Sequence, residues 1–190
     1  MSDYPEWLAS TLASDAAEGR GVLPHTIAAL QAERCVVGPA RVALISQDDN
    51  LSVREALAGP HAPGTVLVVA GGSTSRTAVM GGLMALEMRQ AGIAGLVTDG
   101  LVRDSREIRE LGFAVWCRGV TPAAPKKHGP AVVGGTVSIG GTLIRDGDLV
   151  IADDDGVVIW PRERIDEHMA KAEAKLQEDN ARLARLRGAG

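Results

Sequence analysis

Three charged residues in one short stretch of the chain have the types and spacing for metal and anion chemistry. Arg103 and Asp104 are neighbours, and Glu107 follows three residues later. On a helix, Asp104 and Glu107 share a face with Ile108, so two carboxylates would stand beside an arginine at the mouth of a buried surface. Such a group could hold a divalent cation and an anionic substrate. The D-x-x-E spacing is also that of an acidic capping box, in which Asp104 caps the helix, and these residues taken alone favour capping.

A second candidate is a glycine-rich link from Gly71 to Ser75, followed by Gly81, Gly82, Leu83 and Met84. If the second group opens a helix, its free backbone N–H groups and the positive end of the helix dipole would attract a carboxylate or a phosphate. The alternative is that the glycines only let a helix pack closely on a strand, and on the glycines alone this alternative is favoured. Neither the G-x-G-x-x-G fingerprint nor the G-x-x-x-x-G-K loop occurs, so no nucleotide cofactor is predicted.

The remaining polar residues indicate a site less clearly. Lys126 and Lys127 could bind an anion, although an exposed, solvated pair is the commoner arrangement. The four histidines have no zinc-ligand spacing, and the run 153–156 (DDDG) is typical of a hairpin turn rather than a calcium loop. Cys35 and Cys117 are the only cysteines and form no C-x-x-C motif, so we expect two buried thiols.

The elements that must position these residues alternate between strand and helix. Thr65–Ala70, Ile93–Thr98 and Phe113–Cys117 are apolar runs typical of strands buried on both faces. Gly82–Gln90 and Asp104–Leu111 have helical spacing, and Gly112 can end the second helix. This βαβαβ order predicts a parallel sheet. Both candidate sites then follow the carboxyl ends of strands, where ligands gather in such sheets.

The rest of the chain predicts a β-rich layer and helical ends. Eighteen of the 23 glycines fall in residues 59–156, and the tail after Pro161 is charged and predicts one long amphipathic helix. That helix could pack on its own domain or against a neighbouring subunit. The fold class is therefore α/β with a mixed or double sheet. Further expected helices are Pro5–Ala13 and Pro24–Glu33, and further expected strands are Ala40–Ile45, Ala131–Val133, Thr136–Ile139, Thr142–Ile144, Leu149–Asp153 and Gly156–Trp160.

Composition excludes several functional classes. With 190 residues, a net charge of −4 and only five aromatic residues, the chain suits neither phosphate contacts nor base stacking, so no nucleic-acid partner is predicted. No apolar run approaches the roughly 20 residues of a membrane helix. The first residues lack the features of a signal peptide, and we therefore expect a cytoplasmic protein that does not enter a membrane.

The distance between the two candidates resembles a family signature. Gly82, twenty intervening residues, Arg103-Asp104 and then Glu107 resemble the G-x20-R-D-x2-E/D signature of the 4-hydroxy-4-methyl-2-oxoglutarate aldolase family, which also contains the regulators of ribonuclease E activity. The stretches AGIAGLVTDGLVRDSREIRELGFAVWCRGVTPAAP and GDLVIADDDGVVIWP are similar to the family too. Thr136, where the family usually has proline, and the run 146–148 (DGD in place of PGD) depart from it and leave the substrate open.

The resemblance implies a fold and a set of roles. The fold would be a β/β/α swivelling-domain sandwich over residues 1–162, with a helical extension over 163–190, assembled as homotrimers or homohexamers. The amides of Gly81, Gly82, Leu83 and Met84, together with Arg103 and Lys127, would bind substrate. Asp104 would ligate Mg²⁺ or Mn²⁺, and Glu107 would hold a water of that ion. A C-terminal acid of a neighbouring subunit takes part in some members, and the candidates here are Glu173, Glu178 and Asp179.

The resemblance also implies an activity. It is a class II pyruvate aldolase that cleaves 4-hydroxy-4-methyl-2-oxoglutarate or 4-carboxy-4-hydroxy-2-oxoadipate, with oxaloacetate decarboxylation as a companion. The alternative is a non-catalytic protein that binds and inhibits a ribonuclease. Regulator-type members typically lack the acid found here at Glu107, so its presence favours the enzyme. A third reading is a relative that acts on a different oxo acid, because the signature marks only the pyruvyl end.

Overall fold

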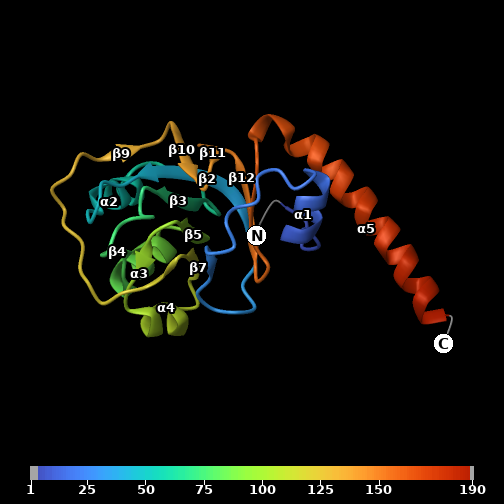
Figure 1. Ribbon diagram of the computed structural model, residues 1–190, viewed down its shortest axis with the longest axis horizontal. Helices are drawn as coiled ribbons and strands as arrows, with labels where there is room; N and C mark the ends of the chain where they lie inside the picture. Colours follow the sequence, from blue (N-terminus) through green and yellow to red (C-terminus); the bar gives the residue numbers. More distant parts are fainter. Residues whose placement is uncertain (1–3, 189–190) are drawn as a thin grey trace.

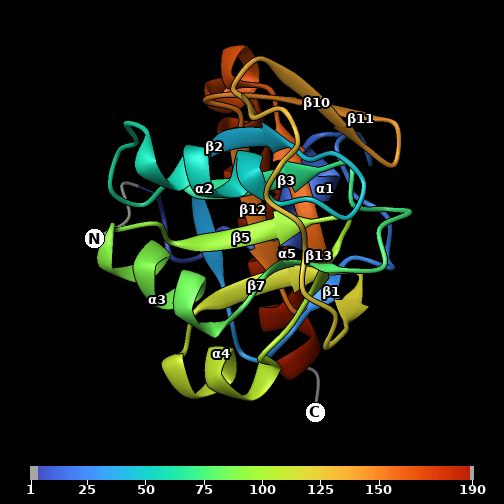
Figure 2. The ribbon, with the colours of Figure 1, turned by 90° about the vertical axis from the view of Figure 1, so that its left-hand side faces the viewer.

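The computed structural model describes residues 4–188 and is built around one large, strongly curved sheet (Figures 1 and 2). Its strand order is β1-β7-β5-β3-β2-β12-β13, with β9 also paired to β2. Parallel pairing joins β2, β3, β5 and β7, and the remaining pairs of this sheet are antiparallel. The strands of the sheet are β1 (Ala28–Ala29), β2 (Val36–Leu44), β3 (Val66–Ala70), β5 (Gly95–Thr98), β7 (Ala114–Cys117), β9 (Val132–Val133), β12 (Leu149–Asp153) and β13 (Gly156–Trp160).

Within residues 4–188, two smaller sheets and five α-helices complete the fold. The helices are α1 (Ser10–Ala16), α2 (Leu51–Ala58), α3 (Gly82–Gln90), α4 (Ser105–Leu111) and α5 (Ile165–Gly188), with a 3-10 turn at Arg162–Arg164. The small sheets are the hairpin of β10 (Thr136–Ile139) and β11 (Thr142–Arg145), and a parallel set of β4 (Ala78–Met80), β6 (Leu101–Val102) and β8 (Gly119–Val120). The predicted βαβαβ unit, β3-α3-β5-α4-β7, is confirmed, as is the predicted α/β class with a β/β/α arrangement and a long C-terminal helix.

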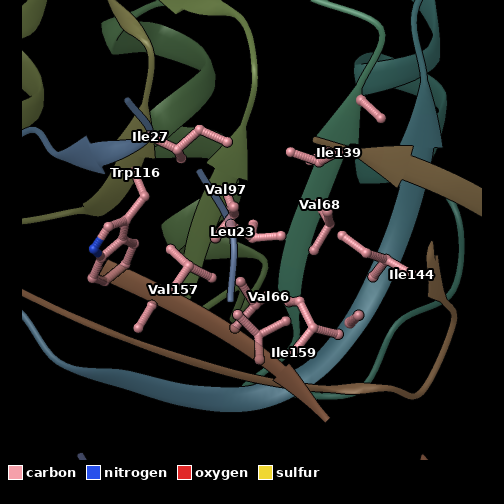
Figure 3. Packing of buried hydrophobic residues seen from close by; sticks show 14 of the residues in the cluster. Leu23, Ile27, Val66, Val68, Val97, Trp116, Ile139, Ile144, Val157 and Ile159 are labelled. Carbon is pink, nitrogen blue, oxygen red and sulfur yellow. The ribbon is translucent and has the colours of Figure 1, made fainter. Parts of the chain in front are cut away.

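Each face of the sheet covers its own hydrophobic core, which explains why β3 is buried along its whole length. On one face, side chains of the sheet pack with Val53, Ala85 and Ile108 from α2, α3 and α4. On the other face they pack with residues of the β10–β11 hairpin and of β13 (Figure 3). Burial on both faces favours continuous apolar runs, and such runs are what made these strands predictable.

Strand β2 connects the two parts of the curved sheet. Its first half, Val36–Pro39, pairs with β12, and its second half, Ala40–Leu44, pairs with β3. One strand therefore belongs to both parts of the sheet, and the β12–β13 end can fold over towards the hairpin layer. The predicted strand Ala40–Ile45 covered only the half that runs beside β3.

Three features of the N-terminal half differ from expectation. The predicted helix Pro24–Glu33 is wrong: this segment contains β1, which pairs with β7, and the Leu30 N–H donates to the Val115 carbonyl. Sheet pairing there outweighs the local helix propensity. The first helix begins at Ser10 rather than Pro5, because residues 5–8 form a turn. Helix α2 was not predicted at all.

Only one of the two cysteines is buried as expected. Cys117 is buried in the sheet, but Cys35 is exposed, so the expectation of a buried thiol is wrong for Cys35. Burial raises the pKa of the Cys117 thiol. Although Cys35 is exposed, partial desolvation of its sulfur and the charges of Asp153 and Asp154 raise the pKa of that thiol too. The expected DDDG hairpin turn is confirmed between β12 and β13.

Helix α5 packs on the body through its first half only. Among the described residues of this helix, only His168 and Ala172 are buried. They lie against a third group of buried hydrophobic side chains, which come mainly from α1, β12 and β13. Beyond them the helix projects away from the sheet (Figure 1). Leu183 and Leu186 are exposed on this projecting part. No helix within residues 4–188 combines the length and apolar character that crossing a bilayer requires.

Acidification is expected to loosen the docking of α5 through His168. Burial of the imidazole, and then the charge of Arg164, lower the pKa of His168 below its ordinary 6.5, although Glu167 opposes this. The centroid of the ring lies 5.3 Å from that of Trp160, with the two planes tilted by 44°, and the lowered pKa favours the neutral imidazole in the folded chain. As the pH falls through about 6.5, the unfolded chain gains a proton that the folded chain does not, so the free energy of unfolding decreases.

Urea unfolding at about pH 7.5 and about pH 5.5 measures this effect, because carboxylates with lowered pKa values titrate at lower pH. His168→Leu should lose stability less steeply on acidification than the wild type. His25→Gln, which changes an exposed histidine, is the matched control. An identical pH dependence in His168→Leu and the wild type would contradict the role of His168.

Candidate active site

The small parallel sheet brings the two sequence candidates together. Ala78 of β4 pairs with Leu101 of β6, and the Arg103 N–H donates to the Met80 carbonyl at 3.0 Å. Gly81 follows β4 and opens α3, while Arg103 follows β6 and precedes α4. The interval between Gly82 and Arg103 therefore contains the helix α3 and the two strands β5 and β6. The two- and three-residue strands of the small sheet had no visible signal in the sequence.

Asp104 does not cap its helix in the way the D-x-x-E spacing suggested. It occupies the N-cap position of α4 with a left-handed φ of 54°, and its side chain makes no capping hydrogen bond. Instead, one carboxylate oxygen, Oδ2, accepts the Gly82 N–H at 3.0 Å and lies 3.5 Å from Nε of Arg103. The capping-box interpretation is therefore wrong. A left-handed aspartate is a strained conformation that the surrounding structure has to maintain, and such residues cluster at functional sites.

The two glycines at the start of α3 leave the space that the Asp104 carboxylate occupies. A Cβ on Gly81 would overlap Oδ2 of Asp104 and approach Arg103, and a Cβ on Gly82 would come within 3.1 Å of the Glu107 Cβ. The two interpretations of these glycines, as part of a binding site and as a means of close packing, are therefore compatible. They permit close packing, and what packs against them is the charged cluster itself.

The glycine-rich link from Gly71 to Ser75 is hydrogen-bonded to a side chain of the protein itself. Asp99, at the end of β5, accepts the Gly72 N–H at 2.7 Å. Burial raises the pKa of this carboxyl group, although the N–H groups of Gly72, Gly71 and Ser73 oppose the shift. At least one amide of this link, that of Gly72, is thus turned towards a side chain of the protein itself.

A cavity of about 310 Å³ lies beside Gly81 and Asp104. Its walls come from four parts of the chain: the start of α2, the start of α3, the β6–α4 junction and the long loop after β8. The residues that line it are Asn50, Arg54, Met80, Gly81, Leu83, Met84, Glu87, Arg103, Asp104, Ala124, Pro125 and Lys127. Most of the residues proposed from the sequence are therefore brought to one place, although Gly82 and Glu107 lie outside this lining.

Lys127 is exposed but belongs to an anchored loop. Asp49 accepts the N–H groups of His128 and Gly129 at 2.7 and 2.9 Å, and also that of Leu51 in α2. Burial would raise the pKa of Asp49, but these three donors outweigh it and lower the pKa. The Lys127 ammonium is thus carried at the rim of the cavity by backbone that is tied to α2.

Glu107 faces the solvent one turn into α4, beside Gly82. Within residues 4–188, no three His, Cys, Asp or Glu side chains are grouped closely enough to hold a metal ion by themselves. Mg²⁺ commonly keeps several waters and uses only one or two carboxylates. Asp104 at the cavity, with Glu107 next to it, is compatible with that mode of binding.

Three polar lining residues were not expected from the sequence: Asn50, Arg54 and Glu87. The Asn50 side chain is buried, and its amide donates to the Val79 carbonyl at 2.9 Å, which ties the start of α2 to β4. Arg54 and Glu87 come from helices whose relative placement the sequence did not reveal. The only available signal was a helical reading of residues 51–58, which would have put Arg54 one turn after Asn50.

Comparison with known proteins gives consistent matches. A family model described as RraA-like, Aldolase/RraA, matches residues 10–159. A protein of Halalkalibacterium halodurans named "Putative 4-hydroxy-4-methyl-2-oxoglutarate aldolase" is 38% identical over 173 residues, which cover 91% of this chain and 82% of that protein. A protein of Arabidopsis thaliana named "Putative 4-hydroxy-4-methyl-2-oxoglutarate aldolase 3" is 40% identical over 66% of this chain and 75% of its own length.

Among solved structures, Streptomyces coelicolor RraAS2 is similar with a TM-score of 0.80 and 32% identity, over 95% of this chain and 93% of that one. It is described as an unusual member of the RNase ES inhibitor RraA protein family. The matches thus include proteins named as aldolases and a protein named for ribonuclease inhibition.

Proposed function

Because the chain belongs to the RraA-like family of aldolase and RraA proteins, we propose that it is a divalent-metal-dependent pyruvate aldolase. Its substrate is 4-hydroxy-4-methyl-2-oxoglutarate or 4-carboxy-4-hydroxy-2-oxoadipate, which it cleaves to pyruvate and a second 2-oxo acid. Decarboxylation of oxaloacetate is the side reaction. One observation carries the proposal: the Asp104 carboxylate, the Arg103 guanidinium and the first turn of α3 meet at a single cavity.

The start of α3 binds the carboxylate of the pyruvyl group. The first N–H groups of a helix have no acceptor within the helix, and here Asp104 already uses that of Gly82. Leu83 and Met84, which both line the cavity, supply the next two amides. The positive end of the helix dipole adds to the attraction. Lys127 at the rim contributes positive charge to the same site.

Asp104 would hold the cation directly, and Glu107 would act through a water bound to it. When bound, the cation supplies Lewis-acid stabilisation of the negative charge that develops on the keto oxygen. Arg103 stabilises the same charge from the protein side, and its ion pair with Asp104 keeps the guanidinium in place. No lysine Schiff base is required, because no electron sink other than the keto group is needed.

The proton moves as follows. A water polarised by Arg103 and the neighbouring acids accepts the proton of the substrate C4 hydroxyl. The C3–C4 bond then breaks, its electron pair becomes the enolate of pyruvate, and C4 leaves as a carbonyl. Protonation at C3 releases pyruvate. Oxaloacetate yields the same enolate when its C4 carboxylate leaves as carbon dioxide.

Metal removal tests the proposal. Purified protein with Mg²⁺ should release pyruvate from oxaloacetate and from 4-hydroxy-4-methyl-2-oxoglutarate, and an excess of EDTA should lower both rates by at least about 100-fold. Coupled reduction of pyruvate by lactate dehydrogenase measures both rates. Adding Mg²⁺ or Mn²⁺ back should restore them, and buffer with Mg²⁺ but without protein gives the spontaneous rate. Pyruvate formation that EDTA does not slow would contradict the metal dependence.

The second candidate function is a non-catalytic protein that binds and inhibits a ribonuclease. The 32% identity to RraAS2 over nearly the whole chain favours it, whereas the acid at Glu107 favours the enzyme. Absence of metal-dependent pyruvate from both substrates, combined with slower RNA cleavage by a purified RNase E-type enzyme, would establish this second function.

We also propose a cytoplasmic homotrimer or homohexamer. The support is the projecting half of α5, because an isolated helical segment of this length is marginally stable in water without a surface to pack on. Glu173, Glu178 and Asp179 lie on this part of the helix and are the acids that could reach a neighbouring site. The mass in solution, measured by light scattering, tests the assembly.

A further inference from the structure

Arg54 is a charged residue of the cavity that has no partner. Its side chain makes no ion pair or hydrogen bond with any residue in the described part of the chain, whereas Arg103 is paired with Asp104. Arg54 is exposed yet lines the cavity. A guanidinium presents a planar fork of donors that matches a carboxylate. This arginine is therefore available to an anionic group of a ligand.

The position of Arg54 separates it from the reacting end of the site. Helix α3 lies between α2 and α4 (Figure 2). Arg54 is carried by α2, whereas Arg103 and Asp104 immediately precede α4. A ligand whose carboxylate binds the first turn of α3 next to Asp104 has to extend towards α2 to fill the rest of the cavity. Its remote end then approaches Arg54.

Hydrogen bonds fix α2 relative to the start of α3, so the separation between Arg54 and the carboxylate-binding end of the cavity can select ligands by length. Asn50 joins the start of α2 to β4 through the Val79 carbonyl, and β4 leads directly into Gly81. The Ser52 hydroxyl donates to the Leu44 carbonyl at 2.7 Å and accepts the Val132 N–H at 3.0 Å. Both ends of the cavity are thus built on hydrogen-bonded elements, and charged groups held in this way discriminate between ligands of different length.

We propose that Arg54 is a specificity-determining residue that binds a carboxylate beyond C4 of the substrate. The inference rests on the proposed aldolase function and assigns a residue to the second carboxylate of its substrates. Arg54 favours 4-hydroxy-2-oxo acids that carry this carboxylate at the end remote from the pyruvyl group. Analogues that end in a methyl group at that position leave the guanidinium unpaired and are poorer substrates.

Oxaloacetate provides an internal comparison. Its second carboxylate is attached at C3 and leaves as carbon dioxide, so it occupies the position of the bond that breaks. No atom of oxaloacetate extends beyond that position towards α2. Removing Arg54 should therefore affect aldol cleavage of 4-hydroxy-4-methyl-2-oxoglutarate much more than decarboxylation of oxaloacetate.

The experiment measures kcat/KM for both substrates with Mg²⁺ in the wild type, Arg54→Ala, Arg54→Lys and Arg106→Ala. Arg54→Ala should lower the ratio of aldol cleavage to decarboxylation about 30-fold, mostly through KM, which corresponds to about 2 kcal/mol. Arg54→Lys keeps the charge without the fork and should fall in between. Arg106, an exposed arginine of α4 paired with Glu110, is the matched control for loss of one positive charge, and its variant should keep the ratio of the wild type.

The outcomes separate this inference from the proposed function. Equal losses on both substrates in Arg54→Ala, or an unchanged ratio, would overturn the role of Arg54 while leaving the aldolase intact. A wild type that forms no pyruvate from either substrate would overturn the proposed function and this inference with it. Thermal unfolding of each variant checks folding, and alanine suits this exposed helical position.

Discussion

Asp104→Ala is expected to abolish pyruvate release from both oxaloacetate and 4-hydroxy-4-methyl-2-oxoglutarate, with kcat/KM reduced by about 1,000-fold or more. The substitution removes the carboxylate proposed to hold the cation and also the partner of Arg103 and of the Gly82 N–H. A 1,000-fold loss corresponds to about 4 kcal/mol of transition-state stabilisation, the magnitude at which loss of a single electrostatic group is felt in a catalytic site. Steady-state kinetics with saturating Mg²⁺ measures it.

Two further variants distinguish the charge of Asp104 from its structural contacts. Asp104→Asn tolerates the left-handed backbone and still offers an oxygen to Gly82, so its thermal stability should match the wild type while its activity is lost. Glu110→Gln changes an exposed carboxylate of the same helix and should retain wild-type rates. If Asp104→Ala kept its activity with excess Mg²⁺, the assignment of this residue to the metal would be wrong.

Gly81→Ala is the second substitution with a large expected effect, about 100-fold on kcat with little change in the melting temperature. The backbone of Gly81 has φ −137° and ψ −172°, which alanine adopts readily, so the added methyl group causes no backbone strain. Its neighbours are the side chains of Asp104 and Arg103 rather than backbone. These side chains can move aside, but moving them displaces the groups that act on the substrate.

The control for this prediction is Gly188→Ala, since a Cβ there meets no atom within 4 Å. Differential scanning calorimetry and kinetics on the two variants separate stability from activity. If Gly81→Ala lost stability and activity in proportion, its effect would be a general packing defect rather than a displaced carboxylate.

The sequence predicted those parts of the fold that continuous patterns determine. The βαβαβ unit is visible because β3 and its neighbours are buried on both faces and therefore consist of uninterrupted apolar residues. The helix predicted at Pro24–Glu33 failed because β1 is only two residues long and forms through its pairing with β7. A pairing of that kind depends on a distant segment and leaves little local trace.

The candidate site was predictable to a similar extent. The fixed interval from Gly82 to Arg103 pointed to the right place, and the resemblance supplied Lys127. The left-handed backbone of Asp104 was not predictable, because D-x-x-E describes an ordinary cap equally well. Arg54 was missed because α2 reaches the cavity through the tertiary contacts of Asn50 and Ser52, which lie far from the signature.

Because β4 pairs with β6, the glycines that follow β4 and the Arg103–Asp104 pair that follows β6 are brought together. Their meeting depends on the number of residues between them more than on the identity of those residues. The residues between Gly82 and Arg103 form α3, β5 and β6, and the hydrogen bond from the Arg103 N–H to the Met80 carbonyl brings the end of this segment back beside β4. Exposed positions of α3 outside the cavity lining can therefore vary in evolution at little cost to the site. An insertion or deletion in the same segment would shift the register by which glycine meets aspartate, so the segment can change its chemistry far more easily than its number of residues.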